Sequence, residues 1–303
     1  MKATSVILNI LKPPGMTSHD VIDFIRDVTH QRRVGHAGTL DPSAAGVLVV
    51  MTGRYTRLSR YLMNYDKRYR FELTFGVATD TGDTEGEIVE RRDASNVSEE
   101  QVREAVSTLR GILEMKPHRY SAAKVSGRKA YEIAREGDEP ELEARAVVIH
   151  EVRLISFTPA DEPRALFEVY CGKGTYVRSL AEVIGRRVDN CAHASFVLRT
   201  QIGPFLANEA VTLEELSHLS EEDCLAEAAM SDQQALAGYQ SLRITPDQAH
   251  SLMHGNTLLL SGDYHMGQVL ACFDDAGNLL AMGEVRGSRP QIFQPRTVVS
   301  GGR

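Results

Sequence analysis

The sequence predicts a protein of mixed helix and strand, divided into two domains. A length of 303 residues is typical of two domains. Apolar and polar residues alternate strictly over Tyr69–Phe75, which indicates a half-buried strand, whereas the capping box Ser98-Glu-Glu-Gln101 indicates the start of a helix. After Tyr239, short apolar runs are separated by turns, which is typical of a small β-rich module.

The other elements follow in chain order. The apolar run Val6–Leu11 predicts a first strand, and Thr17 or Ser18 caps a helix with Val21, Ile22, Ile25 and Val28 on one face. Residues 31–46 break all periodicity and predict a loop, after which Val47–Met51 is a strand-sized apolar run. Further along, the pattern predicts strands at Val147–Phe157 and Ala165–Cys171, helices at Ala130–Arg135 and from Tyr176 to Arg187, and a helix opened by the capping box Thr212-Leu-Glu-Glu215.

The C-terminal module is predicted to begin with a short helix from Thr245 that Gly255 ends. Two apolar runs, Val269–Phe273 and Leu279–Met282, then flank a five-residue turn. We therefore expect a first domain over residues 1–238 and a second over residues 243–303.

Several classes of protein are excluded or disfavoured. No apolar run approaches the roughly 18–20 residues of a membrane helix, and Pro13 interrupts the N-terminal apolar stretch before a secretory signal is complete. We expect a cytoplasmic protein. The four cysteines (Cys171, Cys191, Cys224 and Cys272) form no C-x-x-C pair, so we expect reduced core residues and no metal site.

Charge is distributed unevenly along the chain. The net charge is −7, yet residues 1–70 carry 11 Lys and Arg against 5 Asp and Glu, while residues 209–232 hold eight acids and no base. This polarity fits an anionic partner, bound with an affinity that falls as salt rises. A mosaic of solvated faces explains the charges equally well.

The segment Gly35-His-Ala-Gly-Thr-Leu-Asp-Pro42 is the strongest candidate for chemistry. Its glycines allow the backbone to approach a ligand closely, and His36 and Asp41 are five residues apart in a segment too irregular for a helix. On spacing alone, the simpler explanation is a turn in which Asp41 precedes Pro42 and His36 is incidental.

Seven sequence blocks, in order over almost the whole chain, support the functional interpretation. They are Lys12-Pro-Pro-Gly-Met-Thr-Ser18, Gly35-His-Ala-Gly-Thr-Leu-Asp-Pro42 with Gly46, Asp66-Lys-Arg-Tyr-Arg70, Thr79-Asp-Thr-Gly-Asp83 with Gly86, Tyr120-Ser-Ala-Ala-Lys124 with Tyr131 and Arg135, Lys173-Gly-Thr-Tyr-Val-Arg178, and Leu198-Arg199 before Gly203. With these blocks the chain resembles the TruB-type tRNA pseudouridine synthases.

The resemblance implies a fold and a reaction. The fold is α+β: a catalytic domain with a mixed, largely antiparallel sheet flanked by helices, followed by a small β-rich, PUA-like RNA-binding domain. The reaction is the isomerisation of uridine 55 in the T-loop of tRNA, without cofactor or metal, by an enzyme that is a monomer.

The resemblance also implies the catalytic residues. Asp41 matches the nucleophile, which attacks either C1′ or C6 of the uridine; the sequence leaves both open. Arg178 matches the arginine that pairs with this carboxylate and keeps it ionised in a closed pocket. Taken alone, Arg178 is more simply a solvated arginine at the start of a helix.

Four matched positions are expected to contact the substrate. Tyr69 is expected to stack on the extruded uracil and to assist removal of the C5 proton, although alone it fits core packing. Tyr176 and Val197 are expected to line the uridine pocket, and His36 to contact the T-loop. Candidate phosphate contacts, each of which could equally be a solvated charge, are Lys12, Arg32, Arg33, Lys67, Arg68, Lys124, Arg128 and Lys129.

Departures from the family pattern, such as Met115-Lys-Pro-His118, are expected to affect RNA docking rather than the reaction. Two rival functions are a non-catalytic RNA-binding protein and a synthase directed by guide RNA. The trio Asp41, Tyr69 and Arg178 argues against the first, and the absence of a long Lys-rich tail argues against the second.

Overall fold

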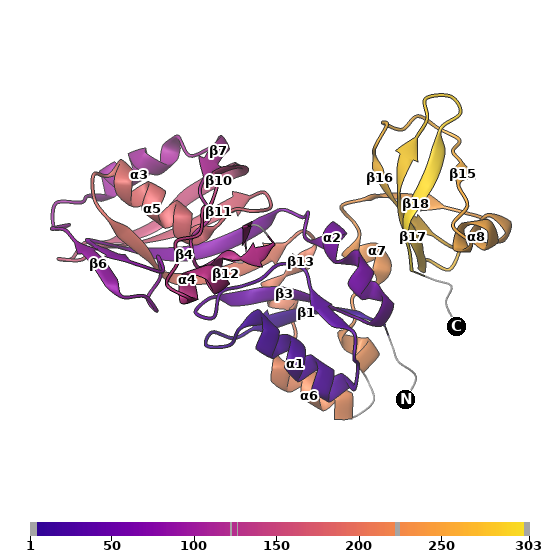
Figure 1. Ribbon diagram of the computed structural model, residues 1–303, viewed down its shortest axis with the longest axis horizontal. Coiled ribbons are helices and arrows are strands. Elements are labelled where there is room, and N and C mark those ends of the chain that lie inside the picture. Colours follow the sequence, from indigo (N-terminus) through magenta and orange to yellow (C-terminus); the bar gives the residue numbers. More distant parts are fainter. Residues whose placement is uncertain (1–4, 122, 126, 222–224, 300–303) are drawn as a thin grey trace.

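The computed structural model describes residues 5–121, 123–125, 127–221 and 225–299. Figure 1 shows a large body built on one extended sheet with helices packed against it, and a smaller β-rich body formed by the C-terminal residues. The combination confirms the predicted α+β fold class.

A nine-stranded sheet organises the large body. Neighbouring strands pair antiparallel along its length, except that β12 and β3 are parallel. In spatial order the strands are β1 (Ile7–Lys12), β3 (Ala45–Thr52), β12 (Ala192–Ile202), β4 (Lys67–Phe75), β11 (Arg164–Cys171), β10 (Arg145–Thr158) and β7 (Gly111–Met115), with β2 (Val34–His36) on β3 and β13 (Phe205–Leu206) on β12.

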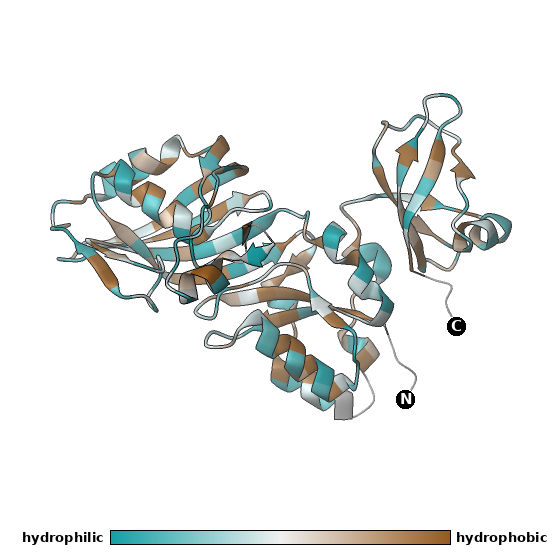
Figure 2. Ribbon diagram, in the orientation of Figure 1, coloured by the Kyte–Doolittle hydropathy of each residue, from teal (hydrophilic) through white to brown (hydrophobic). Residues whose placement is uncertain are grey.

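Two pairs of helices cover different parts of this sheet. In Figure 1, α1 (Ser18–Thr29) and α6 (Leu213–Glu221) lie side by side against β1 and β3, and α3 (Glu99–Ser107) and α5 (Val177–Arg187) lie against β4, β11 and β10. Both apolar and polar residues line each helix in Figure 2, as amphipathic packing requires.

The short elements connect these layers. They are η1 (Gly53–Leu58), α2 (Ser59–Leu62), β5 (Val77–Thr79) paired with β6 (Ile88–Arg91), β8 (Lys124–Val125) paired with β9 (Arg128–Lys129), α4 (Ala130–Arg135), η2 (Ala207–Glu209), η3 (Leu225–Ala228) and α7 (Asp232–Ala235).

The C-terminal body is a five-stranded sheet in the order β14 (Gln240–Arg243), β16 (Val269–Phe273), β17 (Leu279–Arg286), β18 (Ile292–Val298) and β15 (Leu258–Leu259), with α8 (Pro246–Met253) beside it. This sheet begins at Gln240, slightly before the predicted domain start at residue 243. Phe273 and Met282 join a hydrophobic cluster with Val49 of β3. The two bodies therefore share buried apolar surface.

Local sequence signals identified most helices correctly. Side-chain caps are present at Thr17, Ser98 and Thr245, and the hydroxyl of Thr212 accepts the N–H of Glu215 at 3.1 Å. Cys171, Cys191 and Cys272 are buried free thiols, whereas Cys224 lies outside the described residues. Within the described ranges, no helix is long and apolar enough to span a membrane.

Strand β12 was not predicted, although it lies near the middle of the sheet. Its pairing with β4 shifts register between Ala194 and Phe196 and again between Arg199 and Gln201. Each shift reverses the face on which the following side chains lie, so the strand has no sustained alternation in its sequence.

Gly46 is predicted to be indispensable where β3 meets β12. Its φ is +113°, and a Cβ there would lie 2.2 Å from the carbonyl oxygen of Arg199. We expect Gly46→Ala to lower the free energy of unfolding by about 3–5 kcal/mol, because a steric clash adds to backbone strain. Gly111→Ala is the control, since Gly111 has a φ of +99° but no atom within 4 Å of a new Cβ; we expect a loss of only about 1–2 kcal/mol. Urea unfolding followed by circular dichroism compares the two, and equal losses would contradict the steric argument.

Candidate active site

The loop between β2 and β3 carries Asp41, and the N-terminal segment holds it in place. The Ser18 hydroxyl donates to the Leu40 carbonyl at 3.0 Å and accepts the Leu40 N–H at 2.8 Å. On the other side of Asp41, the carbonyl of Pro42 accepts the Lys12 ammonium at 3.3 Å. The residues before and after Asp41 are therefore both fixed, which limits where its carboxylate can lie.

Asp41 forms an ion pair with Arg178. Oδ2 of Asp41 lies 2.9 Å from Nε of Arg178, and the Arg178 side chain is 6% exposed while that of Asp41 is 39% exposed. Arg178 is the second residue of α5. The structure thus brings together two residues that are 137 positions apart, and it leaves the carboxylate accessible to a substrate.

The remaining nitrogens of Arg178 are held by two other loops. Its guanidinium donates to the Thr81 carbonyl at 2.8 Å and to the Tyr120 carbonyl at 3.0 Å. Oδ2 of the buried Asp83 lies 3.6 Å from Arg178 Nη1. The sequence interpretation assigned no role to Asp83, although this acid closes the block Thr79-Asp-Thr-Gly-Asp83; its position in that block was the available signal.

Opposing effects act on the pKa of Asp41. Burial raises the pKa above its ordinary value, Arg178 opposes the rise by favouring the carboxylate, and the negative charge of Asp83 adds to it. The resulting pKa is raised. Without Arg178, a larger fraction of the carboxyl group would be protonated near neutral pH.

Tyr69 lies on β4 in the hydrophobic cluster that also contains Leu40 and Val177, the neighbours of Asp41 and Arg178 in sequence. Its side chain faces the same side of the sheet as Phe71, and the residue is 8% exposed. Burial raises the pKa of the Tyr69 hydroxyl. The aromatic ring therefore packs in the core beside the Asp41 loop.

The other three residues expected to contact the substrate lie on three different elements. Tyr176 is the half-buried N-cap residue of α5, two positions before Arg178. Val197 on β12 packs against the cluster that contains Tyr69. His36 ends β2 and is half-buried. Among the described residues, a direct contact joins Asp41 to Arg178. Tyr176, Val197 and His36 are located only by the helix or strand that carries them.

Two expected phosphate contacts are contradicted by burial. Lys12 is 0% exposed and donates to the Pro13 carbonyl at 2.8 Å as well as to Pro42, and Lys67 is 7% exposed and donates to the Met63 carbonyl at 2.6 Å. Burial lowers the pKa of each ammonium to about 8. Both lysines hold backbone inside the protein, so a phosphate on the surface cannot reach them.

The remaining basic residues occupy varied surroundings. Arg32 and Arg33 are exposed just before β2. Arg68 lies on the sheet face opposite Tyr69, with its guanidinium 4.2 Å from the centre of the Tyr170 ring. Arg128 is paired with Glu136. The side chains of Lys124 and Lys129 lie outside the described residues.

One departure from the family pattern lies close to the ion pair. His118 is 8% exposed, and its Nδ1 accepts the N–H of Tyr120, whose carbonyl holds Arg178. Burial, followed by the charge of Arg178, lowers the pKa of His118 to about 4, so this imidazole is neutral at pH 7. This departure therefore lies one residue away from the contacts of Arg178, through Tyr120.

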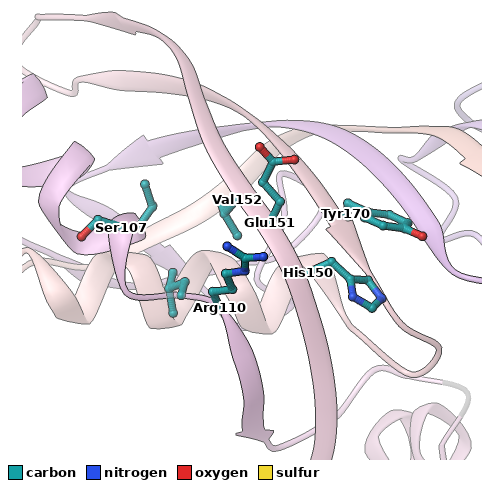
Figure 3. A pocket seen from close by; sticks show the side chains of 8 residues that line it. Ser107, Arg110, His150, Glu151, Val152 and Tyr170 are labelled. Atoms are coloured by element: carbon teal, nitrogen blue, oxygen red, sulfur yellow. The ribbon is translucent and has the colours of Figure 1, made fainter.

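A pocket of about 570 Å³ lies elsewhere, between the end of α3 and strands β10 and β11 (Figure 3). Figure 3 shows Arg110, Glu151 and the rings of His150 and Tyr170 along its wall. Nε2 of His150 lies 3.0 Å from Oδ2 of Asp66. None of the residues predicted for catalysis lines this pocket.

Comparison with solved structures shows the same fold. A protein from an H/ACA RNP bound to a substrate RNA containing 2′-deoxyuridine superposes with a TM-score of 0.76, covering 98% of this chain and 85% of that protein at 22% identity. A protein from a Cbf5-Nop10-Gar1 complex has a TM-score of 0.76 at 23% identity, covering 97% of this chain and 85% of that protein.

Comparison of sequences is more specific. Residues 26–177 match the model of the TruB family pseudouridylate synthase N-terminal domain. The tRNA pseudouridine synthase B of Symbiobacterium thermophilum is 50% identical over 70% of this chain and 71% of its own length. That of Caldanaerobacter subterraneus subsp. tengcongensis is 39% identical over 93% of this chain and 96% of its own. This chain therefore belongs to the TruB family of pseudouridine synthases.

Proposed function

We propose that this enzyme converts uridine 55 in the T-loop of tRNA into pseudouridine, with Asp41 as the nucleophile. The observation that carries the proposal is the 2.9 Å ion pair between Asp41 and Arg178, in which the carboxylate stays accessible while its partner is buried. Relatives that share most of the chain are named tRNA pseudouridine synthase B.

The reaction needs no external reactant, because it is an isomerisation. The N1–C1′ bond breaks, the uracil rotates in the pocket, and C5 bonds to C1′. The C5 proton then leaves to solvent, and N1 takes up a proton. A carboxylate that bonds transiently to C1′ or to C6 makes N1–C1′ cleavage possible in either case.

Arg178 supports this reaction in two ways. Its positive charge favours the carboxylate form of Asp41 and so opposes the rise in pKa that burial causes. Its bonds to the Thr81 and Tyr120 carbonyls prevent the guanidinium from following the carboxylate. Asp83 adds a second anchor, because its Oδ2 lies 3.6 Å from Nη1 of Arg178 whereas Asp41 pairs with Nε.

The aromatic and apolar residues are suited to an extruded base. Uridine in a folded tRNA is stacked, and its extrusion costs a few kcal/mol that pocket contacts must offset. Tyr69, buried beside the Asp41 loop, is proposed to stack on the base once the base has entered, and the half-buried Tyr176 and Val197 are proposed as walls of the pocket. His36, at the end of β2, is proposed to contact the displaced loop of the tRNA.

The C-terminal body is proposed to be a PUA-like RNA-binding domain, beginning near Gln240. Its shared cluster with the catalytic domain supports a fixed relation between two RNA-contacting surfaces. We further infer a cytoplasmic monomer, in keeping with a tRNA substrate and with buried free thiols.

Asp41→Asn is expected to abolish tritium release from tRNA labelled at C5 of uridine, because an amide cannot act as the nucleophile. Affinity for tRNA should stay within about tenfold of wild type, the loss of roughly one good contact. Filter binding measures this affinity, and mapping of pseudouridine in the product identifies the position modified. Undiminished turnover by the variant would exclude Asp41 as the nucleophile.

The dependence of kcat/KM on pH should show an acid limb above the ordinary Asp pKa of about 4, because burial raises the pKa of Asp41 and only its ionised form reacts. Activity is therefore lost as pH falls through this raised pKa. Arg178→Met should move the limb to higher pH, since removal of the positive charge raises the pKa further. Single-turnover rates between pH 4 and pH 9 locate the acid limb of the wild-type enzyme and that of Arg178→Met. Acid limbs at the same pH in the two proteins would contradict the role of Arg178.

Arg33→Gln should weaken tRNA binding uniformly across T-loop sequences and lower the slope of log Kd against log salt by about 1, because one phosphate contact is lost. Arg33 is suited to this role because it is exposed and lies next to β2. Arg103→Gln is the control, since Arg103 is exposed on α3 and paired with Glu99. A slope unchanged by Arg33→Gln would remove Arg33 from the RNA interface.

A further inference from the structure

Arg199 lies where the two halves of the large sheet meet. On β12 it is opposite Gly46 of the parallel strand β3 and opposite Tyr69 of the antiparallel strand β4. The residue is only 2% exposed, and it is among the largest fully buried side chains of the described chain. A buried guanidinium thus lies between the strand that follows the Asp41 loop and the strand that carries Tyr69.

The three nitrogens of Arg199 bind both ends of the Asp41 loop. Nη2 donates to the Gly38 carbonyl at 3.0 Å and Nη1 to the Thr39 carbonyl at 3.2 Å, both before Asp41. Nε donates to the Val47 carbonyl at 2.8 Å, after Asp41. One rigid side chain therefore joins the two ends of the loop at its base.

Arg199 also lies opposite Tyr69. The two residues are register partners on β12 and β4, and the positive charge of Arg199 favours the phenolate form of Tyr69 against the effect of burial. The same guanidinium thus binds the Asp41 loop and acts electrostatically on the Tyr69 hydroxyl.

A purely structural need does not require an arginine at this position. Burying a guanidinium costs several kcal/mol before compensation, and apolar residues of similar volume often replace buried charges without loss of stability. The planar fork holds its donors apart in fixed directions toward Gly38, Thr39 and Val47, whereas the donors of a lysine share one nitrogen.

We propose that Arg199 is a positioning residue of this enzyme, which fixes the Asp41 loop relative to strand β4 and its Tyr69 in one reactive geometry. The proposal rests on the proposed function, in which Asp41 is the nucleophile. Arg199 bonds to the backbone of the Asp41 loop and lies opposite Tyr69, and it acts on the reaction through that loop.

The test compares Arg199→Met and Arg199→Lys with wild type in tritium release from C5-labelled tRNA. Arg199→Met should lower kcat about a hundredfold, the usual effect of a misplacement near 1 Å, with KM within about threefold of wild type. Arg199→Lys keeps the charge but not the fork, and should lower kcat by about tenfold with KM unchanged.

Arg187→Met is the matched control. Arg187 also bridges backbone, donating to the Ala105 carbonyl at 3.0 Å and to Thr108, but it joins α5 to α3. We expect its kcat to match wild type even where its melting temperature falls. A parallel loss of kcat in Arg187→Met and Arg199→Met at equal loss of melting temperature would reduce Arg199 to a structural residue and overturn the proposal.

The pH profile supplies a second readout. The charged groups that act on Asp41 are Arg178 from α5, Asp83 from the loop after β5, Lys12 from β1 and Arg199 from β12. Arg199→Met should move the acid limb of kcat/KM to higher pH, whereas Arg199→Lys should leave it in place because the charge remains. A limb that stays in place in both variants would contradict the electrostatic part of the proposal.

Failure of this proposal can be told from failure of the proposed function. If Asp41→Asn is inactive while Arg199→Lys retains the wild-type kcat, Arg199 is not a positioning residue and the proposed function stands. If Asp41→Asn is fully active, the proposed function itself fails. Arg199→Lys decides the matter even if Arg199→Met does not fold.

Discussion

The proposed active site depends on one ion pair, in which the partly exposed carboxylate of Asp41 meets the buried guanidinium of Arg178. Burial disfavours the charged form of Asp41, and the Arg178 guanidinium opposes that effect at 2.9 Å. A flexible arginine that moved away from Asp41 would no longer favour the carboxylate form. The Thr81 and Tyr120 carbonyls hold Arg178 in place, so its guanidinium links Asp41 to two loops that are distant in sequence.

The fold could be predicted from sequence where the signal is local. Capping boxes and the alternation of Tyr69–Phe75 each depend on residues a few positions apart, and the structure confirms them. Strand β12 could not be predicted, because its two register shifts remove the alternation and it carries the buried polar residue Arg199. Its place beside β3 depends on a parallel contact between residues about 150 positions apart, which local patterns do not encode.

The candidate site was predictable to a different extent. A sequence block indicates which residue types recur, so Asp41 and its partner Arg178 could be paired before the structure was known. A sequence block does not indicate which lysine and arginine side chains are buried in the folded protein. Lys12 and Lys67 can be buried because the carbonyls of Pro42 and Met63 accept hydrogen bonds from their ammonium groups, and these partners come together only on folding.

The same argument changes what the charge distribution means for RNA binding. The surplus of positive charge in residues 1–70 favours an anionic partner, but Lys12 and Lys67 are buried. A buried ammonium that does not neutralise a phosphate releases no counterion when RNA binds. The salt dependence of RNA binding is therefore expected to come from exposed residues, of which the proposal names Arg32 and Arg33. Composition alone overestimates this group, because Lys12 holds the carbonyl of Pro42 in the Asp41 loop.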